Sequence, residues 1–232
     1  MTLAEQIIYE DNHLLALNKR PGQIVQGDKT GDTCLADEVK AFLKERDQKP
    51  GNVFCGVIHR LDRPVSGVVL FAKTSKALSR MNEVLKSRSC RKIYHAVVKQ
   101  RPPQEEGHLE DYLLRNEKLN KSFIVPPPDP EGTHNPQAKL AVLDYRLLSA
   151  SEGGYYLLEV ELHTGRHHQI RCQLAHLGCP IRGDLKYGYP RSNPDGSISL
   201  HSYSFAFEHP VRREPVVITA RDPWNPIFPI VP

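Results

Sequence analysis

Short apolar runs separated by turn residues dominate the hydrophobic pattern of the chain, and they predict a sheet-rich fold. Apolar residues at 7–9 and 13–19 flank the turn pair Asp11-Asn12, a pattern typical of a β-hairpin. Further strands are predicted at 57–58, 67–72, 92–99, 155–162, 199–208 and 216–220. The last two are expected to be joined around His209-Pro210.

Helical periodicity is confined to three segments. Leu35, Val39, Phe42 and Leu43 form the apolar stripe of a helix over 35–44. A second helix is expected from a Ser75 cap to Lys86, and a third from Arg166 to Leu177, where Gly178 ends it. The proline-rich stretch 126–136 predicts an exposed loop. We therefore expect an α+β fold: a single mixed domain over 1–232 with a largely antiparallel central sheet and peripheral helices.

The composition is that of an ordinary globular protein, with 39% hydrophobic and 25% charged residues in a chain of 232. No apolar run approaches the roughly 18 residues of a membrane-spanning helix. Acidic residues stand where a signal peptide needs a basic start, so we expect a cytoplasmic protein. The 5 cysteines include no C-x-x-C pair, which favours reduced thiols used for packing.

Positive charge is concentrated in one segment. Nine basic residues and one acidic residue lie between Lys73 and Arg101, so this segment alone exceeds the net charge of +4 of the whole chain. Such a cluster is typical of a surface that binds a polyanion such as nucleic acid. The alternative is a solvated helix face whose charges are balanced by distant acids.

The loop predicted after residue 58 places a carboxylate, Asp62, between Arg60 and Arg63. A carboxylate in this position can accept a proton or attack an electrophilic carbon, and the flanking arginines favour its ionised form. The alternative is a structural role, since an aspartate in a turn often accepts hydrogen bonds from nearby backbone.

A second loop, from Thr164 to Arg171, is crowded with hydrogen-bond donors. His167 and Arg171 are four residues apart and would share one face of the predicted helix. Cations near a helix N-terminus oppose the helix dipole, which suggests an anion site. The alternative, which the loop taken alone favours, is that these side chains are solvated. His163 and His167 are also spaced as a metal-binding pair, but no further ligand completes the set.

Together these motifs resemble the RluA branch of the RNA pseudouridine synthases. The motifs that carry the resemblance are Asn18-Lys19, His59-Arg60-Leu61-Asp62, Ser66-Gly67, Ala72-Lys73, Lys92-Ile93-Tyr94, Thr164-Gly165-Arg166-His167-His168-Gln169-Ile170-Arg171, His176-Leu177-Gly178, Pro180-Ile181, Gly183-Asp184, Leu200-His201 and His209-Pro210. Several ordered motifs over nearly the whole chain are far more specific than any one of them.

The resemblance implies the pseudouridine synthase catalytic fold and an RNA isomerase that needs neither metal nor organic cofactor. It implies that Asp62 is the catalytic aspartate, that Tyr94 contacts the target base or moves a proton, and that Arg171 is the basic partner of Asp62. Arg60 would contact RNA and help to extrude the base. The other residues that we predict to bind RNA are His59, Lys73, Arg91, Lys92, Arg166 and His167. The expected partner is ribosomal or transfer RNA, bound by a monomer.

The sequence departs from the usual pattern of the family at Arg20, Val65, Cys172-Gln173 and Cys179. Val65 stands in place of the usual Thr, and Arg20 in place of the usual Pro. We also expect the chain to consist of the catalytic domain, with target selection resting on that domain. Two other functions remain open: a non-catalytic RNA-binding or RNA-assembly factor, and a nucleoside glycosidase. A glycosidase usually pairs two carboxyl groups, and Asp62 is the one in a plausible catalytic loop.

Overall fold

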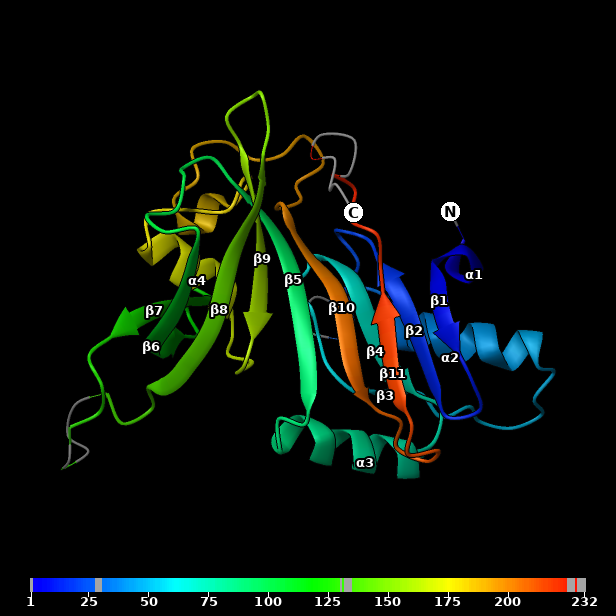
Figure 1. The fold of residues 1–232 in the computed structure, drawn as a ribbon. Coiled ribbons are helices and arrows are strands. Elements are labelled where there is room, and N and C mark those ends of the chain that lie inside the picture. The colour runs from blue at the N-terminus through cyan, green and yellow to red at the C-terminus, as the bar shows by residue number, and fades with distance from the viewer. Residues whose placement is uncertain (1, 28–30, 130, 132–134, 225–227, 229–232) are drawn as a thin grey trace. The chain divides into compact units, whose positions relative to one another are not determined.

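The computed structural model describes residues 2–27, 31–129, 131, 135–224 and 228. The chain divides into two compact units (Figure 1). Unit 1 contains the described residues of Met1–Arg91 and His201–Arg221, and unit 2 contains those of Lys92–Leu200 and Asp222–Pro232. The prediction of one domain over 1–232 stays a prediction.

Unit 1 is built on a mixed β-sheet. Its strands are β1 (Ile7–Glu10), β2 (Leu14–Lys19), β3 (Gly56–Val57), β4 (Ser66–Ala72), β10 (Leu200–Glu208) and β11 (Pro215–Thr219). β2 pairs with both β1 and β4 in antiparallel fashion, β10 lies parallel to β4, and β11 returns antiparallel to β10. The hairpins predicted around Asp11-Asn12 and His209-Pro210 are therefore confirmed.

Three helices accompany this sheet: α1 (Leu3–Gln6), α2 (Leu35–Arg46) and α3 (Ser75–Lys86). α3 buries Ala77 and Met81 in a core shared with alternate residues of β2 and β4. Its N-cap is Thr74, whose Oγ1 accepts a hydrogen bond from the Ala77 N–H at 3.2 Å. The predicted cap at Ser75 is wrong by one residue, because Thr74 is the residue with extended backbone geometry.

Unit 2 is an antiparallel sheet in the order β5-β9-β8-β6-β7. Its strands are β5 (Cys90–Val98), β6 (Glu106–Asn116), β7 (Lys121–Val125), β8 (Lys139–Ala150) and β9 (Tyr156–Leu162). β6, β7 and β8 were not predicted. In β6 only Leu113 is buried, so the alternation of apolar and polar residues that marks a strand is weak there.

Unit 2 also contains α4 (Gln169–His176) and the short helix η1 (Leu185–Tyr187). α4 begins three residues later than predicted, because His168 has a left-handed backbone with φ +53° and a helix cannot continue through it. His167 therefore precedes the helix, and the prediction that it shares a helical face with Arg171 is wrong. Gly178 ends the helix with φ +87°, as predicted.

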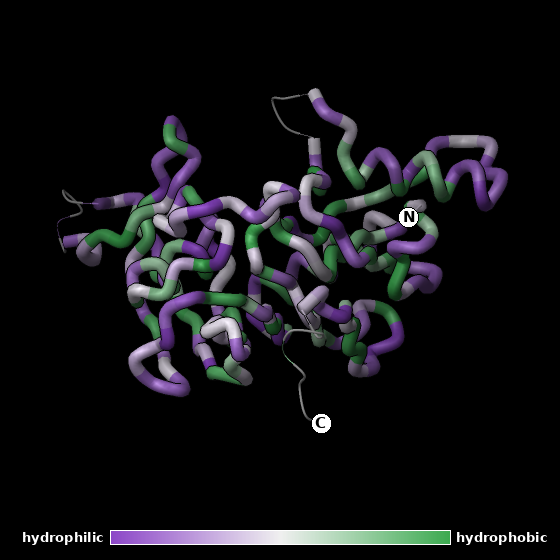
Figure 2. The backbone as a smooth tube through the Cα atoms, turned by 90° about the horizontal axis from the view of Figure 1, so that it is seen from above, coloured by the Kyte–Doolittle hydropathy of each residue, from purple (hydrophilic) through white to green (hydrophobic). Residues whose placement is uncertain are grey.

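The strands and flanking helices of the two units confirm the predicted α+β fold, with largely antiparallel pairing and peripheral helices. Hydrophobic and hydrophilic residues alternate along much of the backbone, as expected for elements buried on one side (Figure 2). Cys34, Cys172 and Cys179 are buried thiols, which agrees with a packing role. Among the described residues, no helix has the length and apolar character needed to cross a membrane.

Candidate active site

Asp62 lies half-buried in the loop between β3 and β4 of unit 1. The loop closes as a turn in which the Val65 N–H donates to the Asp62 carbonyl at 3.0 Å. A second backbone bond, from Gly22 N–H to the Arg63 carbonyl at 2.8 Å, ties the turn to the segment after β2. The turn fixes the main chain on both sides of the carboxylate.

Lys19, at the end of β2, binds this loop through its buried ammonium group. Its side chain is fully buried, and Nζ donates to the carbonyls of Arg20 at 3.0 Å, Arg63 at 3.1 Å and Val65 at 2.6 Å. Burial lowers the pKa of Lys19 to about 7, and the nearby Asp62 carboxylate opposes this shift. Three carbonyl acceptors and one carboxylate thus compensate for the cost of burying the ammonium group.

The far end of the loop is fixed to β10. The Ser66 side chain lies 2.8 Å from Nδ1 of the buried His201, whose Nε2 lies 3.1 Å from the Ala220 carbonyl. A carbonyl can only accept, so Nε2 carries a proton, and in the neutral imidazole the Ser66 hydroxyl donates to Nδ1. Gly67 follows with φ +110°, and a Cβ there would overlap the backbone of Ser202. Only glycine fits where the two strands approach so closely.

Three other loop residues have distinct environments. The ring of His59 meets that of Phe205 edge-on, with the ring centres 5.0 Å apart. Arg60 is exposed, whereas Val65 is buried with 2% of its surface accessible. Because the Val65 side chain packs in the core while its carbonyl binds Lys19, the absence of the usual threonine hydroxyl leaves the turn intact.

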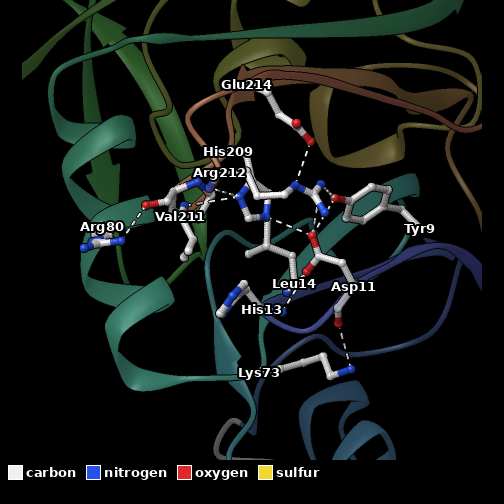
Figure 3. Close-up of polar contacts among 11 residues, drawn as sticks. Tyr9, Asp11, His13, Leu14, Lys73, Arg80, His209, Val211, Arg212 and Glu214 are labelled. Atoms are coloured by element: carbon white, nitrogen blue, oxygen red, sulfur yellow. Dashed lines mark hydrogen bonds and ion pairs between the residues drawn. The ribbon is translucent and has the colours of Figure 1, made fainter.

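The structure gives Lys73 a structural partner. Its Nζ lies 2.6 Å from a carboxylate oxygen of Glu10. It also donates to the Asp11 carbonyl at 2.8 Å (Figure 3). Hydrogen bonds from Arg46 and Lys73 lower the pKa of Glu10 to about 2, although burial of the carboxyl group acts in the opposite direction. The assignment of Lys73 and of the exposed Arg91 to RNA binding stays a prediction.

In unit 2, the turn before α4 is organised by the buried side chains of Thr164 and Gln169. The Thr164 hydroxyl donates to Gln169 Oε1 at 2.8 Å, and the same oxygen accepts from the Arg166 N–H at 3.0 Å. Arg166 Nε in turn donates to the Leu140 carbonyl at 2.8 Å. These contacts hold residues 164–169 in a turn and explain why the helix starts late.

Arg171 projects from the first turn of α4 into a buried ion pair. Its Nε and Nη2 donate to the two carboxylate oxygens of Asp184, at 2.7 and 2.9 Å, and both residues are at least 95% buried. The guanidinium carbon also lies 5.2 Å from the centre of the Tyr187 ring. A bidentate pair over an aromatic ring fixes the orientation of the guanidinium plane.

Tyr187 connects this pair to β7. Its hydroxyl accepts a hydrogen bond from the Ser122 N–H at 2.9 Å and donates to the Ser122 carbonyl at 3.2 Å. His168 Nδ1 lies 3.1 Å from the same hydroxyl, and the ring of His167 stacks on that of His168 at 3.8 Å. Burial, followed by the charges of Arg171, His167, Lys186 and Arg115, lowers the pKa of His168 to about 2. His168 is therefore neutral.

Tyr94 and Lys92 share one face of β5, because side chains two residues apart in a strand point to the same side. Tyr94 is buried, with 7% of its surface accessible, and pairs with Val160 of β9. A Cβ on Gly165 would lie 3.6 Å from Lys92 Nζ. The structure therefore brings Lys92 to the Thr164–Arg171 loop within unit 2.

Sequence reasoning assigned no role to Lys19, Asp184 or Tyr187. The available signals were a lysine inside an apolar strand and the Gly183-Asp184 motif, but neither shows which group its side chain binds. In the part of the chain that the structure describes, no three His, Cys, Asp or Glu side chains come close enough to hold a metal ion.

Comparison with solved structures identifies the fold. The human protein RNA Pseudouridylate Synthase Domain Containing 4 superposes with a TM-score of 0.79 at 24% identity, covering 95% of this chain and 90% of that one. Human RNA Pseudouridylate Synthase Domain Containing 1 gives a TM-score of 0.70 at 22% identity, covering 95% and 84%. The fold is thus that of the pseudouridylate synthases.

Sequence comparison identifies the family. A family model described as RNA pseudouridylate synthase matches residues 13–176. The tRNA pseudouridine synthase C of Pectobacterium carotovorum subsp. carotovorum is 33% identical over 233 residues, which cover 95% of this chain and 60% of that protein. Its namesake from Vibrio cholerae is 33% identical over 234 residues, covering 93% and 90%. The chain belongs to the RNA pseudouridylate synthase family, and the predicted isomerase class and RNA substrate are confirmed.

Proposed function

We propose that this protein converts specific uridines of structured RNA into pseudouridine, with Asp62 as the catalytic aspartate and transfer RNA as the substrate. The observation that carries the assignment of Asp62 is the loop itself. A half-buried carboxylate stands on a turn whose carbonyls are bound by a fully buried lysine, Lys19. The choice of transfer RNA is supported by relatives that are named for tRNA and match over almost the whole chain.

The reaction moves the uracil from N1 to C5 attachment on the same sugar. The N1–C1′ bond breaks, the base turns, a C5–C1′ bond forms, C5 loses its proton and N1 gains one. Atoms and electrons balance without an oxidant or a second substrate. Asp62 acts either by forming a covalent adduct with sugar or base, or by removing the C2′ proton to give a glycal.

The other assigned residues bind and orient the substrate. A uridine within folded RNA must first leave the base stack, and Arg60, exposed on the catalytic loop, helps to extrude it. Tyr94 contacts the extruded base or moves a proton, and Arg171 is the basic partner that favours the ionised form of Asp62. His59, Lys73, Arg91, Lys92, Arg166 and His167 contribute to RNA binding.

Release of the C5 proton provides a direct assay. Purified protein is incubated with transfer RNA transcripts that carry 5-tritiated uridine, and the tritium released to water is counted. We expect release by the wild type and none by Asp62→Asn, which keeps the shape of the side chain but removes its charge. Tritium release by Asp62→Asn would contradict the assignment, and RNA binding without release by the wild type would favour a non-catalytic RNA-binding factor.

We further propose that the protein acts as a monomer in the cytoplasm, with residues 1–232 forming one catalytic domain. Light scattering coupled to size-exclusion chromatography is expected to give the mass of a single chain, 26.3 kDa. A mass of twice that value would contradict the proposal for the oligomeric state.

A further inference from the structure

Unit 2 carries a cluster of exposed or half-buried cations around the start of β7. Arg115 lies near the end of β6, Lys118 lies in the β6–β7 turn, Lys121 begins β7, and Lys186 lies on η1. Lys186 Nζ donates to the Asn120 carbonyl at 3.0 Å, which places η1 against the turn. Four cations that are up to 71 residues apart in sequence are therefore gathered at one place.

The charges of this cluster are available to a ligand. Within the described part of the chain, no carboxylate forms an ion pair with Arg115, Lys118, Lys121 or Lys186. Arg115 and Lys186 both act on the buried His168, although burial is the larger cause of its low pKa. Both cations therefore contribute to the positive electrostatic potential at His168.

An aromatic ring completes the surface. Phe123 is 39% exposed on β7, and Lys121 Nζ lies 5.4 Å from the centre of its ring and 5.0 Å from that of Tyr187. Leu119 and Leu185, near the same turn, are 59% and 58% exposed. An exposed aromatic ring beside cations is the combination that binds single-stranded nucleic acid, because bases stack on the ring while the cations contact phosphates. We call Arg115, Lys118, Lys121, Phe123 and Lys186 the β7 patch.

The basic segment Lys73–Arg101 differs from this patch. Several of its charges are used within the protein: Lys73 pairs with Glu10, Arg80 donates to the Pro210 carbonyl (Figure 3), and Arg101 pairs with Glu105. Counting charges along the sequence therefore overestimates the number of basic side chains in this segment that are available to bind RNA. It also misses the β7 patch, whose members are dispersed along the chain.

We propose that the β7 patch binds the phosphate backbone of the substrate RNA and that Phe123 stacks on an unpaired base. This inference rests on the proposed function and goes beyond it by naming a binding surface outside the Asp62 loop and the Thr164–Arg171 loop. An acidic protein surface would also complement the charge, but it would not use the exposed aromatic ring in the same way.

The test replaces three lysines of the patch by glutamine, in the variant K118Q/K121Q/K186Q. Affinity for unfractionated transfer RNA is measured by fluorescence anisotropy between about 50 and 200 mM salt. We expect Kd to rise about tenfold. The slope of log K against log salt should become less steep by about 2 to 3, since each of the three lost phosphate contacts removes roughly 0.7 to 0.9. The matched control K40Q/K44Q/K49Q changes three lysines in and after α2 of unit 1.

To distinguish RNA binding by the patch from catalysis by Asp62, the binding measurement is repeated in an Asp62→Asn background. The same loss of RNA affinity is expected there, because binding does not require chemistry. Phe123→Leu is expected to weaken binding of poly-uridylate by about fivefold, since an aliphatic side chain cannot stack as a ring does. Unchanged affinity and slope in the triple variant, or an equal loss in the α2 control, would overturn the proposal.

Discussion

Asp184 is the residue whose replacement tests the architecture of unit 2 most sharply. Asp184→Asn keeps the size of the side chain but removes the charge that two nitrogens of Arg171 bind at 2.7 and 2.9 Å. One of the two oxygens becomes an NH₂ group, which cannot accept. The variant therefore takes away the carboxylate without leaving a cavity.

The magnitude follows from burial. Arg171 and Asp184 are 5% and 1% exposed, so water cannot replace the lost carboxylate. Removing one partner of a buried pair costs about 3–5 kcal/mol. The amide oxygen of asparagine still accepts one hydrogen bond, so we expect a loss near the lower end, about 3 kcal/mol. For a chain of this size, that loss lowers Tm by about 6–12 °C.

The assay combines thermal and urea unfolding with tritium release. Glu152→Gln, which changes an exposed carboxylate of the same unit, serves as the control and is expected to stay within about 0.5 kcal/mol of the wild type. If Arg171 has its proposed role, Asp184→Asn also lowers kcat, measured at a temperature where the variant is folded.

A double variant separates stability from chemistry. In R171M/D184L both charges are replaced by apolar side chains of similar volume, an exchange that is often neutral for a buried pair. We expect its stability to return to within about 1 kcal/mol of the wild type, whereas tritium release is lost because Arg171 is absent. Wild-type stability in Asp184→Asn would refute the reasoning about the ion pair, and full activity in R171M/D184L would refute the role of Arg171.

Three further predictions concern unit 1. The native state sheds the Lys19 proton near pH 7, whereas an unfolded lysine holds it to about 10.5, so stability should rise with pH above 7. Urea unfolding at about pH 7 and 8.5 should show this rise in the wild type and not in Lys19→Met; identical pH dependence would count against it. Gly67→Ala should cost about 3 kcal/mol in urea unfolding, because φ is +110° and the added Cβ meets Ser202; a loss below about 0.5 would contradict this. The ion pairs of Glu10 should be lost as pH falls from about 4.5 towards 2, so acid unfolding of Glu10→Gln should be less steep than that of the wild type.

The strands and helices that sequence predicted well are those with strong local patterns. The residues of β4 are all buried, and those from Val68 to Ala72 are apolar. α3 carries its apolar residues at helical spacing, so both elements were recognised. β6 failed because its residues are mostly exposed or half-buried, and it is stabilised by long pairing with β8. Pairing between strands thirty residues apart leaves little trace in either strand alone.

In the candidate site, too, features set by local sequence were predictable and features set by long-range contacts were not. Asp62 was predicted as the catalytic candidate from a motif, since its place in a loop after a buried strand is a local property. The role of Lys19 depends on carbonyls more than forty residues away, and the bond between Arg171 and Asp184 depends on how α4 packs against η1. The late start of α4 was missed because a buried hydrogen-bond network, not local propensity, sets the backbone of His168.

The central claim is that Asp62 makes this protein an RNA pseudouridine synthase acting on transfer RNA. The most direct test maps pseudouridine in total RNA from cells that lack the gene, complemented with either the wild type or Asp62→Asn. The account predicts that one or a few transfer RNA sites disappear and that only the wild-type gene restores them. Restoration of the sites by Asp62→Asn, or an RNA map that does not change when the gene is lost, would contradict it.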